Sequence, residues 1–158
     1  YVKASFGTLL TVFGTLGILG ALIFPIDNFS YVAASITASG IKTAHPVQLA
    51  VEAYQAKHGL FPDAAMDSNL TSEVMIEDRH IRSIHLKHGG RIEITYDTQD
   101  IDWGTSWWHQ LLLIESNDLS GKTLVLVPTL AEGGIVWDEC SEGTVPKRSR
   151  HYQCSAHK

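Results

Sequence analysis

The chain has 158 residues, a formal net charge of −5 and a hydrophobic fraction of 44%, which is sufficient for one domain with a single core. Its 12 basic residues do not gather into a stripe, so the sequence lacks the electrostatic pattern of a nucleic-acid-binding protein. Any contact with DNA would have to come from a surface repeated in an assembly.

The first segment, residues 1–26, is strongly apolar and contains a charge-free stretch from Ala4 to Ile26. A bilayer core needs roughly 20 apolar helical residues, so we expect a helix that crosses a membrane once or forms the core of a polymer. It is longer than the apolar region of a signal peptide, which predicts that it is retained. Glycine and proline weaken a helix, and we expect a kink or an interruption at the proline. The residues concerned are Gly14, Gly17, Gly20 and Pro25.

Residues 28–58 have the pattern of an amphipathic helix. Val47, Val51 and Tyr54 recur at helical spacing and predict an apolar face that packs on the rest of the chain. Pro46 predicts a second kink, and Gly59 is placed as a C-terminal stop.

After residue 80 the hydrophobic period changes to two, which is typical of strands. Residues 81–87 and 91–96 read as a hairpin that turns at two glycines, and residues 122–129 and 134–137 read as a second pair of strands. We therefore expect an α+β fold, in which one long N-terminal helix, bent at the two prolines, packs its amphipathic half on a four-stranded antiparallel sheet over about residues 80–139.

The long connection from Asp97 to Gly121 lies between the two strand pairs and holds Trp103, Trp107 and Trp108. Connections of this length are often functional, and aromatic anchors dominate binding energetics. The tryptophans are therefore a possible contact loop. The alternative, which we favour, is that they pack on the sheet or on a neighbouring subunit.

No arrangement of residues predicts a catalytic, metal or cofactor site. His80, His85 and His88 cluster in the sequence, but positions 85 and 88 of a strand would point to opposite faces. No Cys-x-x-Cys or His-Glu-x-x-His motif is present. We interpret the acidic pairs as solvated loop charges. We expect that the protein is not an enzyme.

Cys140 and Cys154 are the two cysteines of the chain. A pair that closes a short loop after an apolar anchor indicates a disulfide in an oxidising compartment. Two independent buried thiols are the alternative. We expect a disulfide loop over residues 140–154.

Taken together in their order along the chain, these segments resemble the type IV pilins, particularly the bacterial type IVa class, over essentially the whole chain. The matching stretches are Gly17–Pro25, Gln48–Tyr54, Gly59–Pro62, Leu119–Thr129, Gly134–Cys140 and Gly143–Cys154. Members of this family are stored in the membrane and polymerise through N-terminal helices into filaments for attachment, twitching motility or DNA uptake.

The sequence departs from the pilin family pattern at the N-terminus. Mature pilins usually begin with an N-methylated phenylalanine and carry a glutamate at position five, whereas Tyr1 and Ser5 stand here and no acid precedes Asp27. Tyr1 is the candidate for N-methylation. The glutamate is thought to pair with a neighbour's amine, and a buried charge needs a partner. Either Tyr1 is not in the usual register, or the filament tolerates a neutral core, or the chain does not polymerise in the usual way.

The resemblance implies an apolar filament-core helix over residues 1–26 and a globular head over residues 27–158. It implies a homo-oligomeric helical filament, a single-pass inner-membrane stage before assembly, pilus assembly machinery as a partner, and an extracellular pilus that contacts surfaces or DNA. The alternatives are a membrane-anchored pilin-like binding module that does not polymerise, and a minor pilin or secretion-system pseudopilin.

Overall fold

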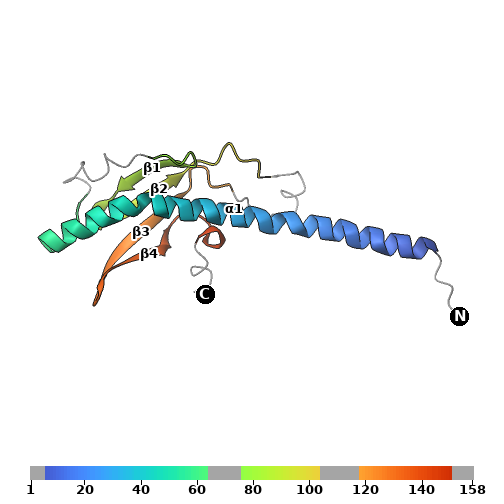
Figure 1. Ribbon diagram of the computed structural model, residues 1–158, viewed down its shortest axis with the longest axis horizontal. Coiled ribbons are helices and arrows are strands. Elements are labelled where there is room, and N and C mark those ends of the chain that lie inside the picture. The colour runs from blue at the N-terminus through green and yellow to red at the C-terminus, as the bar shows by residue number, and fades with distance from the viewer. Residues whose placement is uncertain (1–5, 64–75, 104–117, 151–158) are drawn as a thin grey trace.

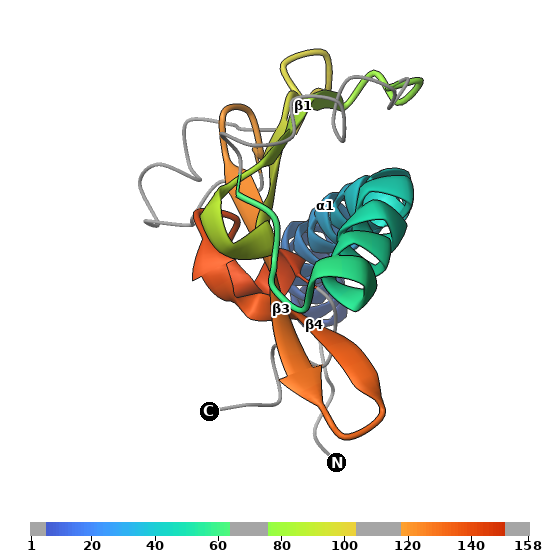
Figure 2. The same ribbon diagram turned by 90° about the vertical axis from the view of Figure 1, so that its left-hand side faces the viewer.

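A computed structural model describes the backbone of residues 6–63, 76–103 and 118–150, and the side chains of these segments from residue 30 onward. One helix, α1 (Phe6–His58), is followed by four strands and two short 3₁₀ turns. Figure 1 shows that the C-terminal half of α1 crosses the sheet, while its N-terminal half projects beyond it. The view along the helix shows two layers, with α1 on one face of the sheet (Figure 2). This arrangement confirms the predicted α+β fold.

The sheet consists of β1 (Ile81–Leu86), β2 (Ile92–Tyr96), β3 (Thr123–Ala131) and β4 (Gly134–Gly143), in that spatial order. All neighbouring strands are antiparallel. The first hairpin turns through a 3₁₀ turn that contains Gly89 and Gly90, both at φ +73°, a conformation that glycine adopts without strain. Both predicted strand pairs are confirmed.

α1 is a single helix that passes through both prolines without a break, so the interruption considered at Pro25 does not occur in this structure. A proline removes one backbone donor, and the 53-residue helix retains hydrogen bonds on both sides of it. The helix ends as expected at Gly59, whose φ is +73° and whose N–H donates to the Gln55 carbonyl over 2.7 Å.

The core lies between one face of α1 and the alternating inward positions of the strands. Every third or fourth helix residue from 33 to 51 is buried, as a helix packed on a sheet requires. The polar residue Gln48 is also buried on this face, at 7% exposure, so the buried face of the helix is wider than its apolar residues alone indicate. The largest fully buried apolar side chains in the sheet are Ile92, Ile94, Tyr96, Leu124 and Leu126.

The helix crosses β2 at Gly40, and the approach is close. A Cβ atom on Gly40 would collide with the hydroxyl oxygen and the ring of Tyr96. That hydroxyl donates to the backbone carbonyl of Thr37 over 3.0 Å. Burial raises the pKa of Tyr96 well above its usual range, and the charges of Asp78 and Glu139 raise it further. The phenol is therefore a neutral donor that fixes α1 on the sheet.

A second polar contact joins α1 to the far edge of the sheet. The indole Nε1 of Trp137 on β4 donates to the Glu52 carboxylate over 2.8 Å. Trp137 and Pro128 are paired across β3 and β4 and share the face that carries the helix. The C-terminal half of α1 is thus held at two points along its length.

β4 is longer than the sequence predicted, since it continues past Trp137 through Cys140 to Gly143. The register with β3 shifts between Val127↔Asp138 and Val125↔Glu142, so β4 contains extra residues there. The Asp138 carboxylate accepts the Cys140 N–H over 2.8 Å and supports this bulge. A bulge breaks the period of two, which is why the alternation used for prediction ended early.

Candidate functional site

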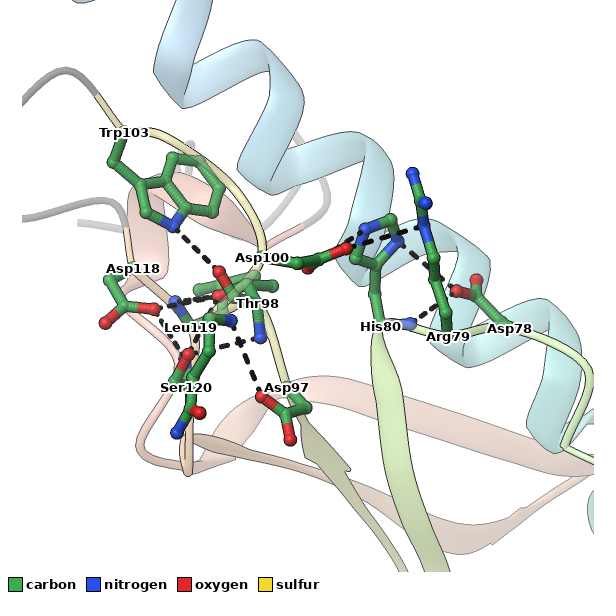
Figure 3. A network of polar contacts seen from close by, with 11 residues as sticks. Asp78, Arg79, His80, Asp97, Thr98, Asp100, Trp103, Asp118, Leu119 and Ser120 are labelled. Carbon is green, nitrogen blue, oxygen red and sulfur yellow. Dashed lines mark hydrogen bonds and ion pairs between the residues drawn. The ribbon is translucent and has the colours of Figure 1, made fainter.

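A network of hydrogen bonds ties together the two ends of the tryptophan-containing connection (Figure 3). Thr98 follows β2 and is fully buried. Its hydroxyl donates to the Asp118 carboxylate over 2.8 Å and accepts the Leu119 N–H over 3.0 Å. Its own N–H donates to the Ser120 hydroxyl over 3.1 Å. The connection therefore leaves and re-enters the head at one fixed point.

The Asp118 carboxylate is held in its ionised form. Partial burial raises the pKa of Asp118, but hydrogen bonds from the Ser120 backbone and hydroxyl and from the Thr98 hydroxyl outweigh this effect, so its pKa lies below the ordinary value. A carboxylate that accepts several hydrogen bonds is a strong anchor for a loop. This site positions a chain segment, and its described groups do not form an acid–base pair.

Trp103 lies at the start of the same connection and is 8% exposed. Its indole N–H points at the Thr98 carbonyl, with 3.4 Å between the heavy atoms. The ring belongs to the hydrophobic core cluster. Trp107 and Trp108 lie outside the described residues, so their role as a contact loop stays a prediction.

A second polar cluster lies just before β1 and reaches the helix. The Ser39 hydroxyl on α1 donates to the Asp78 carboxylate over 2.5 Å. The two ring nitrogens of His80 lie 3.4 Å from Asp78 and 3.8 Å from Asp100, and Arg79 lies 3.6 Å from Asp100. Burial raises the pKa of Asp78, but hydrogen bonds from Ser39 and the His80 backbone outweigh it and lower that pKa overall. The cluster fastens the first strand to α1.

A pocket of about 480 Å³ opens between this cluster and the helix. Its walls come from one turn and a half of α1 and from the segments that precede β1 and follow β2. Most of the wall is apolar, and the polar part is formed by Arg79 and His80, which lie beside Asp100. The lining residues are Tyr31, Val32, Ser35, Ile36, Arg79, His80 and Ile101.

The C-terminal end of the described chain is anchored by Arg150, which is 5% exposed. Its guanidinium donates to three backbone carbonyls: those of Val145 over 2.9 Å, Cys140 over 2.5 Å and Gly143 over 2.9 Å. Burial lowers the pKa of Arg150, and the charge of Asp138 opposes this shift. The segment after β4 is therefore folded back onto the strand, and residue 150 lies beside Cys140.

The structure describes only some of the other residues that the sequence analysis named. Cys140 lies on β4, whereas Cys154 and Tyr1 lie outside the described residues. The backbone of the glycine-rich segment, including Gly14, Gly17, Gly20 and Pro25, is helical, and its side chains are not described. The disulfide, the modified N-terminus and the filament-core role therefore stay predictions.

Sequence reasoning missed the groups that hold the head together. These groups are the side chains of Tyr96, Thr98 and Arg150. Their hydrogen-bond partners lie far away in the sequence or in irregular segments, and hydrophobic periodicity does not detect such bonds. Within the segments that the structure describes, no group of three or more His, Cys, Asp or Glu side chains is arranged to hold a metal ion. Among the residues whose side chains are described, which begin at residue 30, no helix has the length and apolar character needed to cross a membrane.

Comparison with protein families adds an independent observation. A family model described as Pilin (bacterial filament) matches residues 33–155. That range begins on the buried face of α1 and includes all four strands. No curated protein gives a significant match to the chain.

Proposed function

The chain belongs to the pilin family of bacterial filament proteins, and we propose that it is a structural subunit of a type IV pilus that polymerises through its N-terminal helix. Pilins are structural proteins, and the family as a whole builds extracellular pili from many subunits. The finer assignment concerns how this chain assembles and what the filament does.

The observation that carries the proposal is the division of α1 into two halves. The half from residue 33 to residue 51 buries one face on the chain's own sheet, while the half that begins at Phe6 projects beyond the sheet (Figure 1). The sequence of the projecting half is apolar and free of charge up to Ile26. Such a segment gains most by packing against other apolar helices or lipid. This favours an inner-membrane stage followed by a filament core built from helices of many copies.

The glycine-rich part of this helix is suited to a change on assembly. Each glycine weakens a helix interior by about 1 kcal/mol relative to alanine, and Pro25 removes a further hydrogen bond. We therefore expect residues 14–25, which are helical in the single chain, to lose regular helix where the helices pack in the filament. Density for a continuous helix through residues 14–25 in an assembled filament would contradict this.

We further propose that Cys140 and Cys154 form a disulfide that closes the C-terminal loop. Arg150 supports this, because its bond to the Cys140 carbonyl places the chain beside Cys140 only four residues before Cys154. The loop would then be held by the guanidinium and by the disulfide. Surface attachment, twitching motility and DNA uptake are the roles that a filament of this kind would serve.

Electron microscopy of material sheared from the surface of bacteria that produce the chain tests the proposal. Filaments whose main component, identified by mass spectrometry, is this chain are the expected result. Cells from which the chain has been deleted are the control, and they should lack these filaments. If the chain stays in the membrane fraction and the sheared filaments are unchanged by its deletion, it is not the structural subunit.

A further inference from the structure

The tip of the β3–β4 hairpin exposes aliphatic side chains that the helix does not cover. Along β3, Leu124 and Leu126 are at most 1% exposed, whereas Leu130, on the same face, is 62% exposed. On the other face of the hairpin Val136 is 55% exposed. The apolar face of the sheet thus continues past the point where α1 ends its cover. We call Leu130, Val136 and the intervening turn with Glu132 the hairpin tip.

From this tip and the pocket at Tyr31 we infer a contact between copies: the hairpin tip of one subunit inserts into the pocket between α1 and β1 of a second copy of this chain. The inference rests on the proposed function, since it names how heads contact one another in the filament. Leu130 supplies the apolar group, and the pocket supplies apolar walls from Val32, Ile36 and Ile101.

The hairpin tip carries a carboxylate, and the pocket rim carries a guanidinium. Glu132 is the one charged residue between Thr129 and Val136, and it is exposed. The pocket rim carries Arg79, whose side chain is 79% exposed. Arg79 contacts Asp100 through Nε at 3.6 Å, and the terminal nitrogens of its guanidinium extend beyond that contact (Figure 3). A guanidinium has five N–H donors, so it can bind Asp100 and a second carboxylate together.

The positions of the two surfaces prevent them from meeting within one chain. The pocket lies where β1 begins and β2 ends, and the tip lies at the far end of the other strand pair. Both ribbon views show the tip at the opposite side of the head from the segments that precede β1 and follow β2 (Figures 1 and 2). Two complementary surfaces at opposite ends of a subunit make a head-to-tail contact, and such a contact builds an open helical polymer when its rotation does not close a ring.

The helix gives the axial offset that this contact requires. Trp137, which directly follows the hairpin tip on β4, bonds to Glu52, and Glu52 lies 16 residues after Ile36 of the pocket. Sixteen helical residues span about 24 Å. With parallel α1 helices, the tip therefore meets the pocket of a neighbour displaced along the filament axis by about 24 Å.

Cross-linking of assembled filaments tests the contact. A chain with Leu130→Cys and Val32→Cys, treated as intact filaments with a short bis-maleimide, should give a ladder of covalent oligomers on a denaturing gel. The matched control carries Val32→Cys with Leu60→Cys, because Leu60 is a comparably exposed leucine at 56% outside the tip. It should remain monomeric.

Assembly of aspartate variants is the second arm. Leu130→Asp should reduce sheared filaments about fivefold or more, because a carboxylate would be buried in the pocket. Leu60→Asp should assemble within about twofold of the unmodified chain, and both should melt normally because both sites are exposed. Filaments of the cysteine pair that give no ladder, or normal assembly of Leu130→Asp, would overturn the contact and leave the pilus assignment intact. Absence of filaments from the unmodified chain would instead overturn the proposed function.

Discussion

Replacement of Arg150 by methionine should destabilise the head strongly. The guanidinium is 5% exposed and donates to the carbonyls of Val145, Cys140 and Gly143. Hydrogen bonds to a charged group contribute about 1.5–3 kcal/mol each when one partner is removed. The three bonds share one side chain and are not additive, so we expect a loss of about 3–5 kcal/mol. For a head of this size that corresponds to a fall in Tm of about 10–20 °C.

Thermal unfolding of the full chain in detergent micelles, followed by tryptophan fluorescence, measures this loss. Arg150→Lys keeps the charge but not the planar fork of donors, so it should fall between the unmodified chain and Arg150→Met. Lys147→Met is the matched control, because Lys147 is exposed and its replacement removes one positive charge nearby. If Arg150→Met melts within about 2 °C of the unmodified chain, the three carbonyl contacts do not hold the C-terminal segment.

Two further predictions concern described contacts, and a third concerns the proposed disulfide. The pKa of Asp118 lies below its ordinary value, so its ionised form stabilises the fold at neutral pH and this contribution is lost as the pH falls below about 4. Asp118→Asn should therefore lower Tm at pH 7 and flatten the acid-unfolding profile, and superimposable profiles would contradict this. Gly40→Ala, which elsewhere stabilises a helix by about 1 kcal/mol, should destabilise this chain because of the contact with Tyr96; a Tm at or above that of the unmodified chain would show that the crossing can relax. Cys140 and Cys154 should gain no mass on alkylation of the native, non-reduced protein, and two adducts would exclude the disulfide.

The sequence predicted the elements whose signals are local. Alternation found the strands, and the glycines at positions 59, 89 and 90 marked turns where the structure has positive φ. The spacing of Val47 and Val51 predicted the buried helix face, and both are fully buried. Each of these signals depends on neighbours within a few residues, which is the range over which periodicity and turn chemistry act.

The remaining features depend on contacts between distant segments. Nothing near Arg150 in the sequence indicates that three carbonyls of the preceding strand and turn surround it. The bulge at Asp138 interrupts the alternation of apolar and polar residues in β4, so the last part of this strand could not be predicted from alternation. The long helix was predicted, and the structure continues it through Pro25 without the interruption that the lost hydrogen bond could have caused.

The contacts that stabilise the head also set the direction in which the projecting half of α1 leaves it. Gly40 and Tyr96 fix one point of the helix on the sheet, and Glu52 fixes a second through Trp137. Two fixed points define the axis of a continuous helix, and the segment from Phe6 onward extends along that axis. A substitution that shifts either point therefore tilts the projecting half relative to the head. In a filament every subunit repeats that tilt, so changes at Gly40 or Glu52 should impair assembly more than their effect on head stability alone would suggest.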